Sequence, residues 1–222
     1  RDLTVTGVQT CALPIFKAKS NGFSDSHISH LTGKKEETIR NQRKRMNITS
    51  SFLMVDTCAG EFEAKTPYFY STYLDQKSEY KIGKNIVILG SGPIRIGQGI
   101  EFDYSTVHGV QAVRKAGYEA VVVNNNPETV STDFDASDRL YFEPLDAESI
   151  FEILDVEKPY GIILQLGGQT AVNLASKVEE YIQKEKLKTK ILGTRVRDMD
   201  AAEDRGKCGE LKIGRASCRE RV

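Results

Sequence analysis

The chain has 222 residues, no formal net charge and 39% hydrophobic residues, which is typical of a globular protein with one medium domain or a small domain joined to a larger one. Such a charge balance gives no overall attraction to nucleic acid or to a membrane surface, and no apolar run approaches the roughly 18 residues of a membrane span. The four cysteines form no CxxC pair and match no histidine spacing, so they argue against a zinc site or a disulfide framework and favour a reducing, cytoplasmic setting.

The two ends differ from the rest of the chain. Residues 1–16 and 213–222 share no periodicity with their neighbours, and both resemble translated sequencing-adapter sequence of the kind that flanks truncated gene predictions. The alternative is an ordinary disordered tail at each end. We therefore base the fold prediction on the residues between them.

Residues 22–48 predict two short helices. Ser24 or Asp25 can cap the first, and Gly33 ends it. Residues 35–46 continue as a polar helix. The apolar positions expected to face inward are Ile28, Leu31, Ile39 and Met46.

Charge is distributed unevenly along the chain. Residues 34–45 hold six basic and two acidic side chains, whereas residues 126–157 hold ten acidic side chains against Arg139 alone. The helix–Gly–helix pattern with a basic second helix resembles a helix-turn-helix DNA-binding module. A solvated helical hairpin explains it better, because no second basic arm follows.

Residues 51–73 are apolar and rich in aromatic side chains, so they need a partner surface to cover them. Residues 75–84 are polar and contain Gly83 near their end, which is typical of a linker. These features predict a small helical domain piece over residues 17–74, followed by a second domain.

From residue 84 onward, short apolar runs alternate with helical patterns. Strands are expected at 86–89, 119–123, 140–142, 161–166 and 190–192. Helices are expected at 101–116, 146–157 and 167–186. This alternation predicts an α/β fold with a right-handed, parallel, Rossmann-like sheet covered on both faces.

Ligands of such sheets bind beyond the carboxyl ends of the strands. Three loops follow strand ends here: the first loop (residues 90–101), the second loop (124–138) and the third loop (167–170). We therefore expect any ligand site of this domain to be built from these loops.

The first loop departs from a dinucleotide-binding fingerprint. Arg95 stands where that fingerprint has glycine, and the next strand ends in Asn124 instead of an acidic residue for a ribose. Glu101 and Asp103 suit the start of a helix, but they compete with a phosphate for the same N–H groups. We predict that this loop does not hold a pyrophosphate by itself.

The second loop is rich in side chains that hydrogen-bond to their own backbone. It is either a rigid, well-capped turn or a surface at which Glu128, Thr129, Ser131 and Thr132 face a ligand or the next domain. The sequence leaves both interpretations open.

The third loop opens a helix with free N–H groups and no acidic neighbour in the sequence. It is therefore the better candidate for an anion or polar-group site, and a close strand-to-helix crossing is the alternative.

No catalytic constellation is evident. His27, His30 and His108 lack carboxylate or cysteine partners nearby in the sequence, and no GxxxxGK[ST] phosphate-binding motif is present. This pattern indicates a scaffold that supplies loops to a site completed elsewhere.

Several long strings carry a family resemblance. GSGPIRIGQGIEFDYSTVHGVQAVRKAGYEAVVVNNNPETVSTDFDASDRLYFEP, followed by GGQT, resembles the large chain of carbamoyl phosphate synthetase. IGQGIEFDY and NPETVSTDFDASDRLYFEP resemble the start of its second, carbamoyl-phosphate-synthesising half. VDTCAGEFEAKTPYFYSTY resembles the end of the helical oligomerisation domain that precedes this half. The resemblance covers about residues 17–212.

The resemblance implies a parent ATP-dependent carbon–nitrogen ligase that makes carbamoyl phosphate from bicarbonate, glutamine-derived ammonia and two ATP, for arginine and pyrimidine synthesis. It implies that residues 17–74 end the oligomerisation domain and that residues 85–212 form a pre-ATP-grasp domain. ATP and magnesium (or manganese) would be held mainly by an ATP-grasp domain beginning beyond Leu211. We expect the fragment alone to bind neither and to be inactive.

The resemblance further implies a small glutaminase chain and the remaining large-chain domains as partners, and a homo-oligomer formed through the helical part, without nucleic acid or membrane. The residues expected to border the substrate site or tunnel are Gly90, Gly92, Arg95, Gly97, Gln98, Gly99, Glu101, Glu128, Thr129, Ser131, Thr132, Gly167, Gly168, Gln169 and Thr170. Alternatives are another ATP-grasp ligase, a biotin-carboxylase-like pre-ATP-grasp domain, or a pure assembly module.

Overall fold

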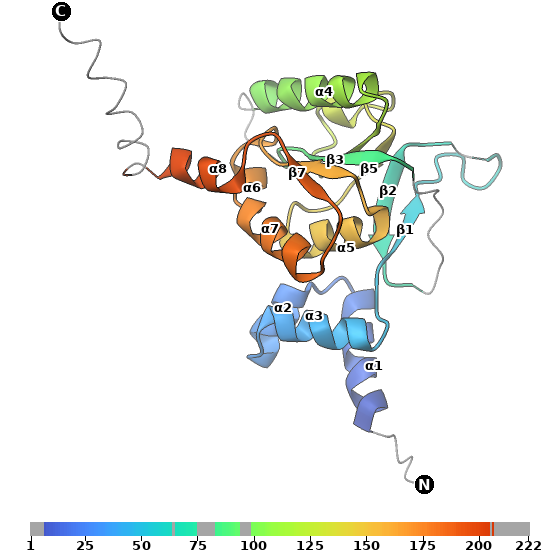
Figure 1. The fold of residues 1–222 in the computed structure, drawn as a ribbon. Helices are drawn as coiled ribbons and strands as arrows, with labels where there is room; N and C mark the ends of the chain where they lie inside the picture. Colours follow the sequence, from blue (N-terminus) through green and yellow to red (C-terminus); the bar gives the residue numbers. More distant parts are fainter. Residues whose placement is uncertain (1–6, 64, 75–82, 94–98, 205, 207–222) are drawn as a thin grey trace, which may run out of the picture.

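The computed structural model describes residues 7–63, 65–74, 83–93, 99–204 and 206 (Figure 1). Its centre is a seven-stranded sheet in the order β1-β2-β5-β4-β3-β6-β7, in which only β1 and β2 pair antiparallel. The strands are β1 (Ser51–Met54), β2 (Tyr68–Thr72), β3 (Asn85–Leu89), β4 (Glu119–Val123), β5 (Arg139–Tyr141), β6 (Gly161–Ile163) and β7 (Lys190–Leu192). The predicted α/β fold with a parallel sheet is confirmed.

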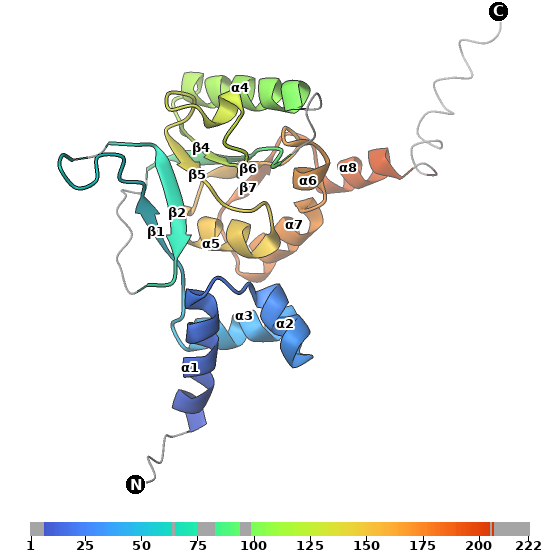
Figure 2. The same ribbon diagram turned by 180° about the vertical axis from the view of Figure 1, so that it is seen from behind.

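Helices cover both faces of the sheet. Helix α4 lies on one face and helices α5 and α7 lie on the other, while α1–α3 form a further layer beyond α5 and α7 (Figures 1 and 2). The helices are α1 (Gly7–Ser20), α2 (Asp25–Thr32), α3 (Glu36–Arg45), α4 (Gly99–Lys115), α5 (Ala147–Glu157), α6 (Gly168–Val172), α7 (Ala175–Lys184) and α8 (Val196–Glu203), with a 3-10 turn, η1, at Val130–Thr132. Within the described residues, no helix combines the length and the apolarity needed to cross a membrane.

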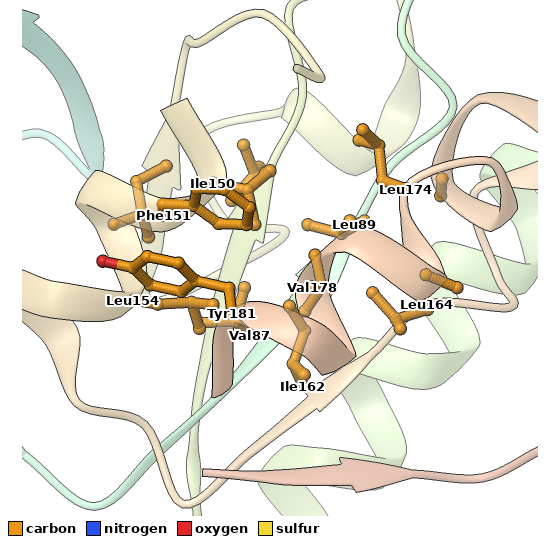
Figure 3. Close-up of a cluster of buried hydrophobic side chains, with 14 of the residues drawn as sticks. Val87, Leu89, Ile150, Phe151, Leu154, Ile162, Leu164, Leu174, Val178 and Tyr181 are labelled. Atoms are coloured by element: carbon orange, nitrogen blue, oxygen red, sulfur yellow. The ribbon is translucent and has the colours of Figure 1, made fainter. Parts of the chain in front are cut away.

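Strand β3 is central because it is buried on both faces. Val87 and Leu89 point toward α5 and α7 (Figure 3), whereas Ile86 and Ile88 point toward α4. All five residues of the strand are buried, which explains why residues 86–89 form a continuous apolar run without alternation.

The strand order reverses its direction at β3. From β3 the chain runs outward through β4 to β5 on one side, and then returns to place β6 and β7 on the other side. The carboxyl ends of β3 and β6 therefore flank the switch point of the sheet, which is where open α/β sheets bind ligands.

The first predicted helix pair forms with the expected boundaries. Ser24 caps α2 by accepting a hydrogen bond from the N–H of His27 (3.1 Å), and Gly33 ends the helix in the left-handed conformation with a φ of 68°. Ile28 and Ile39 are buried as predicted, and Met46 is half-buried. The prediction for Leu31 is wrong.

Leu31 is 71% exposed because its spacing drifts off the buried face of α2. That face runs through Asp25 and Ile28, and each further step of three residues falls 60° short of a full helical turn. Two such steps carry Leu31 out to the solvent.

The aromatic segment after α3 becomes part of the sheet. Strand β2 pairs in parallel with β5, with Tyr68 opposite Leu140, and β1 pairs with β2. Phe52 and Phe69 fill the core against the ring of Tyr141. The partner surface that this segment needs is therefore the edge of the chain's own sheet.

Some element boundaries differ from the predictions. Helix α1 runs across the boundary set at residue 16, and the single helix expected at residues 167–186 is divided into α6 and α7. Strand β6 ends at Ile163, and helix α8 was not predicted. Most of the predicted linker, residues 75–82, lies outside the described residues.

Candidate functional site

The three predicted loops leave the sheet at one edge. We call this edge the rim: it holds the carboxyl ends of β3, β4, β5 and β6 and the described residues that follow each of them. Strand β3 pairs with both β4 and β6, so the loops that follow these three strands leave the same edge side by side. At the base of this rim the N–H of Gly90 donates to the carbonyl of Val123 (2.9 Å), which joins the first loop to the end of β4. The rim therefore brings together residues from distant parts of the sequence.

Asn124 ties the first loop to the second. Its side chain is fully buried, and its Oδ1 accepts hydrogen bonds from the N–H groups of Gly92 (3.1 Å) and Asn126 (3.2 Å). Its Nδ2 donates to the hydroxyl of Ser131 (3.4 Å). The same amide packs on Gly90, where a β-carbon would stand 2.7 Å from Asn124 Cγ. An aspartate at this position would lack the Nδ2 donor, so the residue fits a structural role better than the ribose-binding role of a dinucleotide site.

The second loop is stabilised by hydrogen bonds among its own residues. Ser131 is 1% exposed and Thr132 is 4% exposed, and the Thr132 hydroxyl donates to the carbonyl of Thr129 (2.7 Å). The hydroxyls of Thr129 and Ser131 are 3.1 Å apart. For Ser131 and Thr132 these contacts favour the rigid-turn interpretation. Glu128 is exposed and is the member of this group that faces the solvent.

The sequence suggested that Asp103 competes with a phosphate for the N–H groups at the start of its own helix. The structure gives Asp103 a different role. Helix α4 begins at Gly99, two residues earlier than expected, so Asp103 lies in its second turn. Its buried carboxylate accepts the N–H of Ser131 (3.0 and 3.3 Å). Asp103 therefore fastens the second loop to α4.

The third loop crosses directly over the end of β3. Gly167 lies against the carbonyl of Gly90, and Gly168 adopts a φ of 65° with its α-carbon facing the ring of Phe102. This arrangement is the close strand-to-helix crossing that the sequence offered as the alternative to an anion site.

Two further observations weaken the anion-site interpretation. Helix α6, which the loop opens, has only five residues. The exposed side chain of Gln169 donates from Nε2 to Asn173 Oδ1 (2.8 Å) and to Glu203 Oε1 (2.7 Å). Glu203 belongs to α8, so the fold supplies the acidic neighbour that the local sequence lacks. Thr170 is exposed.

The remaining predicted residues belong to the first loop. Arg95, Gly97 and Gln98 lie outside the described residues. Gly99 opens α4, and Glu101 is exposed on its first turn. The structure therefore brings Gly90, the second loop and the third loop together.

Three residues of the rim were not predicted as site residues. Asn124 was noted only for lacking a carboxylate, and Asn125 has a buried Oδ1 without a hydrogen-bond partner among the described residues. The side chain of Leu145 lies beside Gly92, 3.3 Å from the position of a β-carbon. The run of three asparagines was the available signal for the first two, because such side chains commonly serve turns.

Glu143 lies in the rim just after the carboxyl end of β5. It is 7% exposed and accepts the N–H of Ser71, which continues the hydrogen bonding between β2 and β5 through a side chain. Burial raises the pKa of the Glu143 carboxyl, an effect that the Ser71 hydrogen bonds only partly offset. A carboxylate in this position costs free energy when it is ionised.

The described part of the rim does not fit ATP or a metal ion by itself. The contact between Gly167 and Gly90 fills the switch point, and Asn124 uses its polar atoms on the loops themselves. No group of three or more His, Cys, Asp or Glu side chains within the described residues is placed to hold a metal ion. What the rim can do is present a rigid, hydrogen-bonded wall to a neighbouring domain or ligand.

Three of the four basic residues of α3 are paired within the fold. Arg43 is fully buried, Lys44 contacts Asp155 (2.6 Å), and Arg40 contacts Glu36 on its own helix (2.6 Å). These contacts disfavour the helix-turn-helix alternative, because a phosphate backbone would have to displace them.

Together, the sheet topology and the gathered loops define a Rossmann-like α/β domain whose described rim is a wall of hydrogen-bonded loops. Residues 82–201, more than half of the chain, match the family described as the carbamoyl phosphate synthase pre-ATP-grasp domain. The chain belongs to this family.

Two biotin carboxylases are among the solved structures that match part of this chain. One is the biotin carboxylase domain of a thermophilic 2-oxoglutarate carboxylase bound to ADP, at 18% identity over 59% of this chain and 27% of that chain, with a TM-score of 0.39. The other is the biotin carboxylase subunit of pyruvate carboxylase, at 18% identity over 60% of this chain and 28% of that chain, with a TM-score of 0.38. The chain thus spans little more than a quarter of the length of either structure.

Proposed function

We propose that this chain is part of the large chain of a glutamine-hydrolysing carbamoyl phosphate synthetase, an ATP-dependent carbon–nitrogen ligase. Within it, the chain supplies the pre-ATP-grasp domain of the half that phosphorylates carbamate. The observation that carries this proposal is the family match over residues 82–201, in which the loops of the rim are included.

In this proposal the rim is one wall of a phosphorylation chamber. The first and third loops border the site and the passage for carbamate, with Gly97 and Gly99 among the bordering positions. An ATP-grasp domain that follows in the parent holds ATP and magnesium or manganese and supplies the phosphoryl-transfer chemistry. The contact between Gly167 and Gly90, which occupies the switch point of the sheet, supports this division of labour.

The parent would work with a small glutaminase chain in a reducing, cytoplasmic setting, and the helical part would contribute to a homo-oligomer. The product would serve arginine and pyrimidine synthesis. The isolated chain would have no carbamate-dependent ATP turnover.

A graft into an active synthetase tests the proposal. Residues 51–204 replace the matching segment of a functional large chain, and the hybrid is produced in a bacterial strain without its own carbamoyl phosphate synthetase. We expect growth without added arginine and uracil. The control is the same hybrid with Gly167→Val, which should fail because the third loop can no longer cross β3.

Purified hybrids separate folding from function. A hybrid that is folded and stable but forms no carbamoyl phosphate, while the same residues restore a biotin carboxylase, would overturn the assignment to the synthetase. Within the active hybrid, replacing Gly97 or Gly99 with a bulky residue should uncouple ATP hydrolysis from carbamoyl phosphate formation. Unchanged coupling would contradict the role of the first loop.

A further inference from the structure

The uneven charge of the sequence has a spatial explanation. The basic helix α3 packs against the acidic helix α5, so Arg43 contacts Glu152 (2.7 Å) and Lys44 contacts Asp155 (2.6 Å). The layer of helices α1–α3 below the sheet is visible in both views (Figures 1 and 2). The two oppositely charged segments thus form the interface between this layer and the α/β domain.

Arg43 is the centre of this interface and has no solvent exposure. Its Nε and Nη2 donate to the carboxylate of Asp25 (3.1 and 3.0 Å), and Nη2 also donates to Glu152 Oε1 (2.7 Å). Its Nη1 donates to the carbonyl of Ile48 (3.0 Å). One guanidinium therefore joins α2, α3, the segment before β1, and α5.

A second cation completes the cluster. Lys19 of α1 pairs with Glu148 of α5 and lies 3.4 Å from Asp25. Glu148 also accepts the N–H of Asp25 (2.6 Å) and the hydroxyl of Tyr73 (3.2 Å). We call Lys19, Asp25, Arg43, Glu148 and Glu152 the docking cluster.

The docking cluster fits one orientation of helices α1–α3 on α5. Its charged side chains are at most 11% exposed, so each charge needs the partners that this arrangement supplies. A shift of α2 and α3 along α5 would leave buried charges without partners, which is far more costly than a shift between apolar surfaces.

Helix α5 also reaches the rim. Asp146 caps its start by accepting the N–H of Ser149 (2.8 Å), and the preceding residue, Leu145, packs beside Gly92 of the first loop. The helix that receives the docking cluster on one face therefore begins at the candidate site.

We propose that the docking cluster is a lock that fixes helices α1–α3 on α5, so that the helical segment and the sheet move as one rigid body. In any longer protein that contains this chain, a displacement of the helical segment is transmitted through α5 to the rim. This inference rests on the cluster geometry and does not depend on the proposed function.

Hydrogen exchange of the whole chain, followed by mass spectrometry, tests the lock. In the unaltered chain, the amides of α2 and α3 should exchange within about tenfold of those in β3 and β4, because one body opens as a unit. Arg43→Met should accelerate exchange in α2 and α3 by about 100-fold or more, because it leaves buried carboxylates unpaired, and should leave β3 and β4 protected. The matched control is Arg45→Met, an exposed position on the same helix, which should change neither region.

Other outcomes would overturn the lock. Fast exchange of α2 and α3 in the unaltered chain would show that they are not fixed, and equal acceleration of β3 and β4 by Arg43→Met would show that Arg43 serves the whole fold. If Arg43→Met does not fold, Glu152→Gln tests the lock in its place. Glutamine keeps an oxygen that can accept from Arg43, and it removes one charge. We expect about tenfold faster exchange confined to α1–α3, and no change or a global change would refute the proposal.

Discussion

The backbone of Gly167 lies directly against the carbonyl group of Gly90. A β-carbon on Gly167 would stand 2.1 Å from the oxygen of Gly90 and 2.6 Å from the oxygen of Leu89. The φ of Gly167 is −90°, which any residue can adopt, so this position needs glycine for space and not for conformation. The contact joins the ends of β3 and β6 at the switch point of the sheet.

The first prediction concerns this contact. Gly167→Ala should lower the free energy of unfolding by about 3 kcal/mol or more, because the backbone atoms of Leu89 and Gly90 leave the methyl group no room. Urea unfolding of the two proteins measures the difference. Gly117→Ala is the control: Gly117 has a φ of 79° with no atom near a β-carbon, so the variant should lose only about 1–2 kcal/mol from conformational strain. Equal losses would contradict the steric explanation.

The second prediction concerns Asn124. Asn124→Ala removes the acceptor of two backbone N–H groups in a buried place, so we expect a loss of about 2–4 kcal/mol in the free energy of unfolding. Equilibrium urea unfolding measures it. Asn41→Ala, on the exposed side of α3, should change the value by no more than about 0.5 kcal/mol. A loss for Asn124→Ala as small as that of the control would show that the loops do not depend on this amide.

The third prediction concerns the pH dependence of stability at Glu143. Burial raises the pKa of this carboxyl, so the folded protein carries an ionisation penalty above that pKa, and the penalty disappears as the pH falls through it. Glu143→Gln keeps an oxygen for the N–H of Ser71 without the charge. It should therefore be more stable than the unaltered chain at neutral pH, with a gain that shrinks on acidification. Thermal unfolding between pH 4 and 8 checks this.

A matched variant serves as the control for Glu143. Glu61→Gln changes an exposed glutamate in the segment between β1 and β2, and its effect on stability should not vary with pH. A Glu143→Gln variant that is less stable than the unaltered chain at neutral pH would mean that the carboxylate, and not its burial, dominates at this position.

The fourth prediction concerns Asp138, whose pKa is shifted in the opposite direction from that of Glu143. Burial raises the pKa of Asp138, but hydrogen bonds from Arg114 and from the N–H of Ala120 outweigh burial and hold the pKa below its ordinary value. A lowered pKa stabilises the folded protein above the unfolded-state pKa, and this stabilisation is lost as the pH falls through the folded-state pKa. Asp138→Asn should therefore be less stable at neutral pH, with a deficit that narrows in acid.

The same thermal series measures this deficit. The control is Asp135→Asn, which alters an exposed aspartate of the same loop while its backbone carbonyl still accepts from Arg114. A deficit for Asp138→Asn that is constant across the acid range would show that the lowered pKa does not contribute to stability.

Several parts of the candidate site could be predicted from local sequence. The glycines at the strand ends and the Asn-rich second loop are short-range signals, since they report backbone turns within a few residues. Their assembly into one rim also follows from the topology of parallel strands. The partners of the loops could not be predicted, because Asp103 reaches Ser131 across 28 positions and Gln169 reaches Glu203 across 34.

The amino-acid sequence by itself determined the α/β class, the five parallel strands β3–β7 and the loops that end β3, β4 and β6. It could do so because strands buried on both faces require continuous apolar runs, and turns require particular residues locally. Only the tertiary structure decided that β1 and β2 join the sheet, that Gly167 rests on Gly90, and that Arg43 is buried against Glu152. Each of these depends on a surface supplied by residues some 70 to 110 positions away, and no local pattern contains that information.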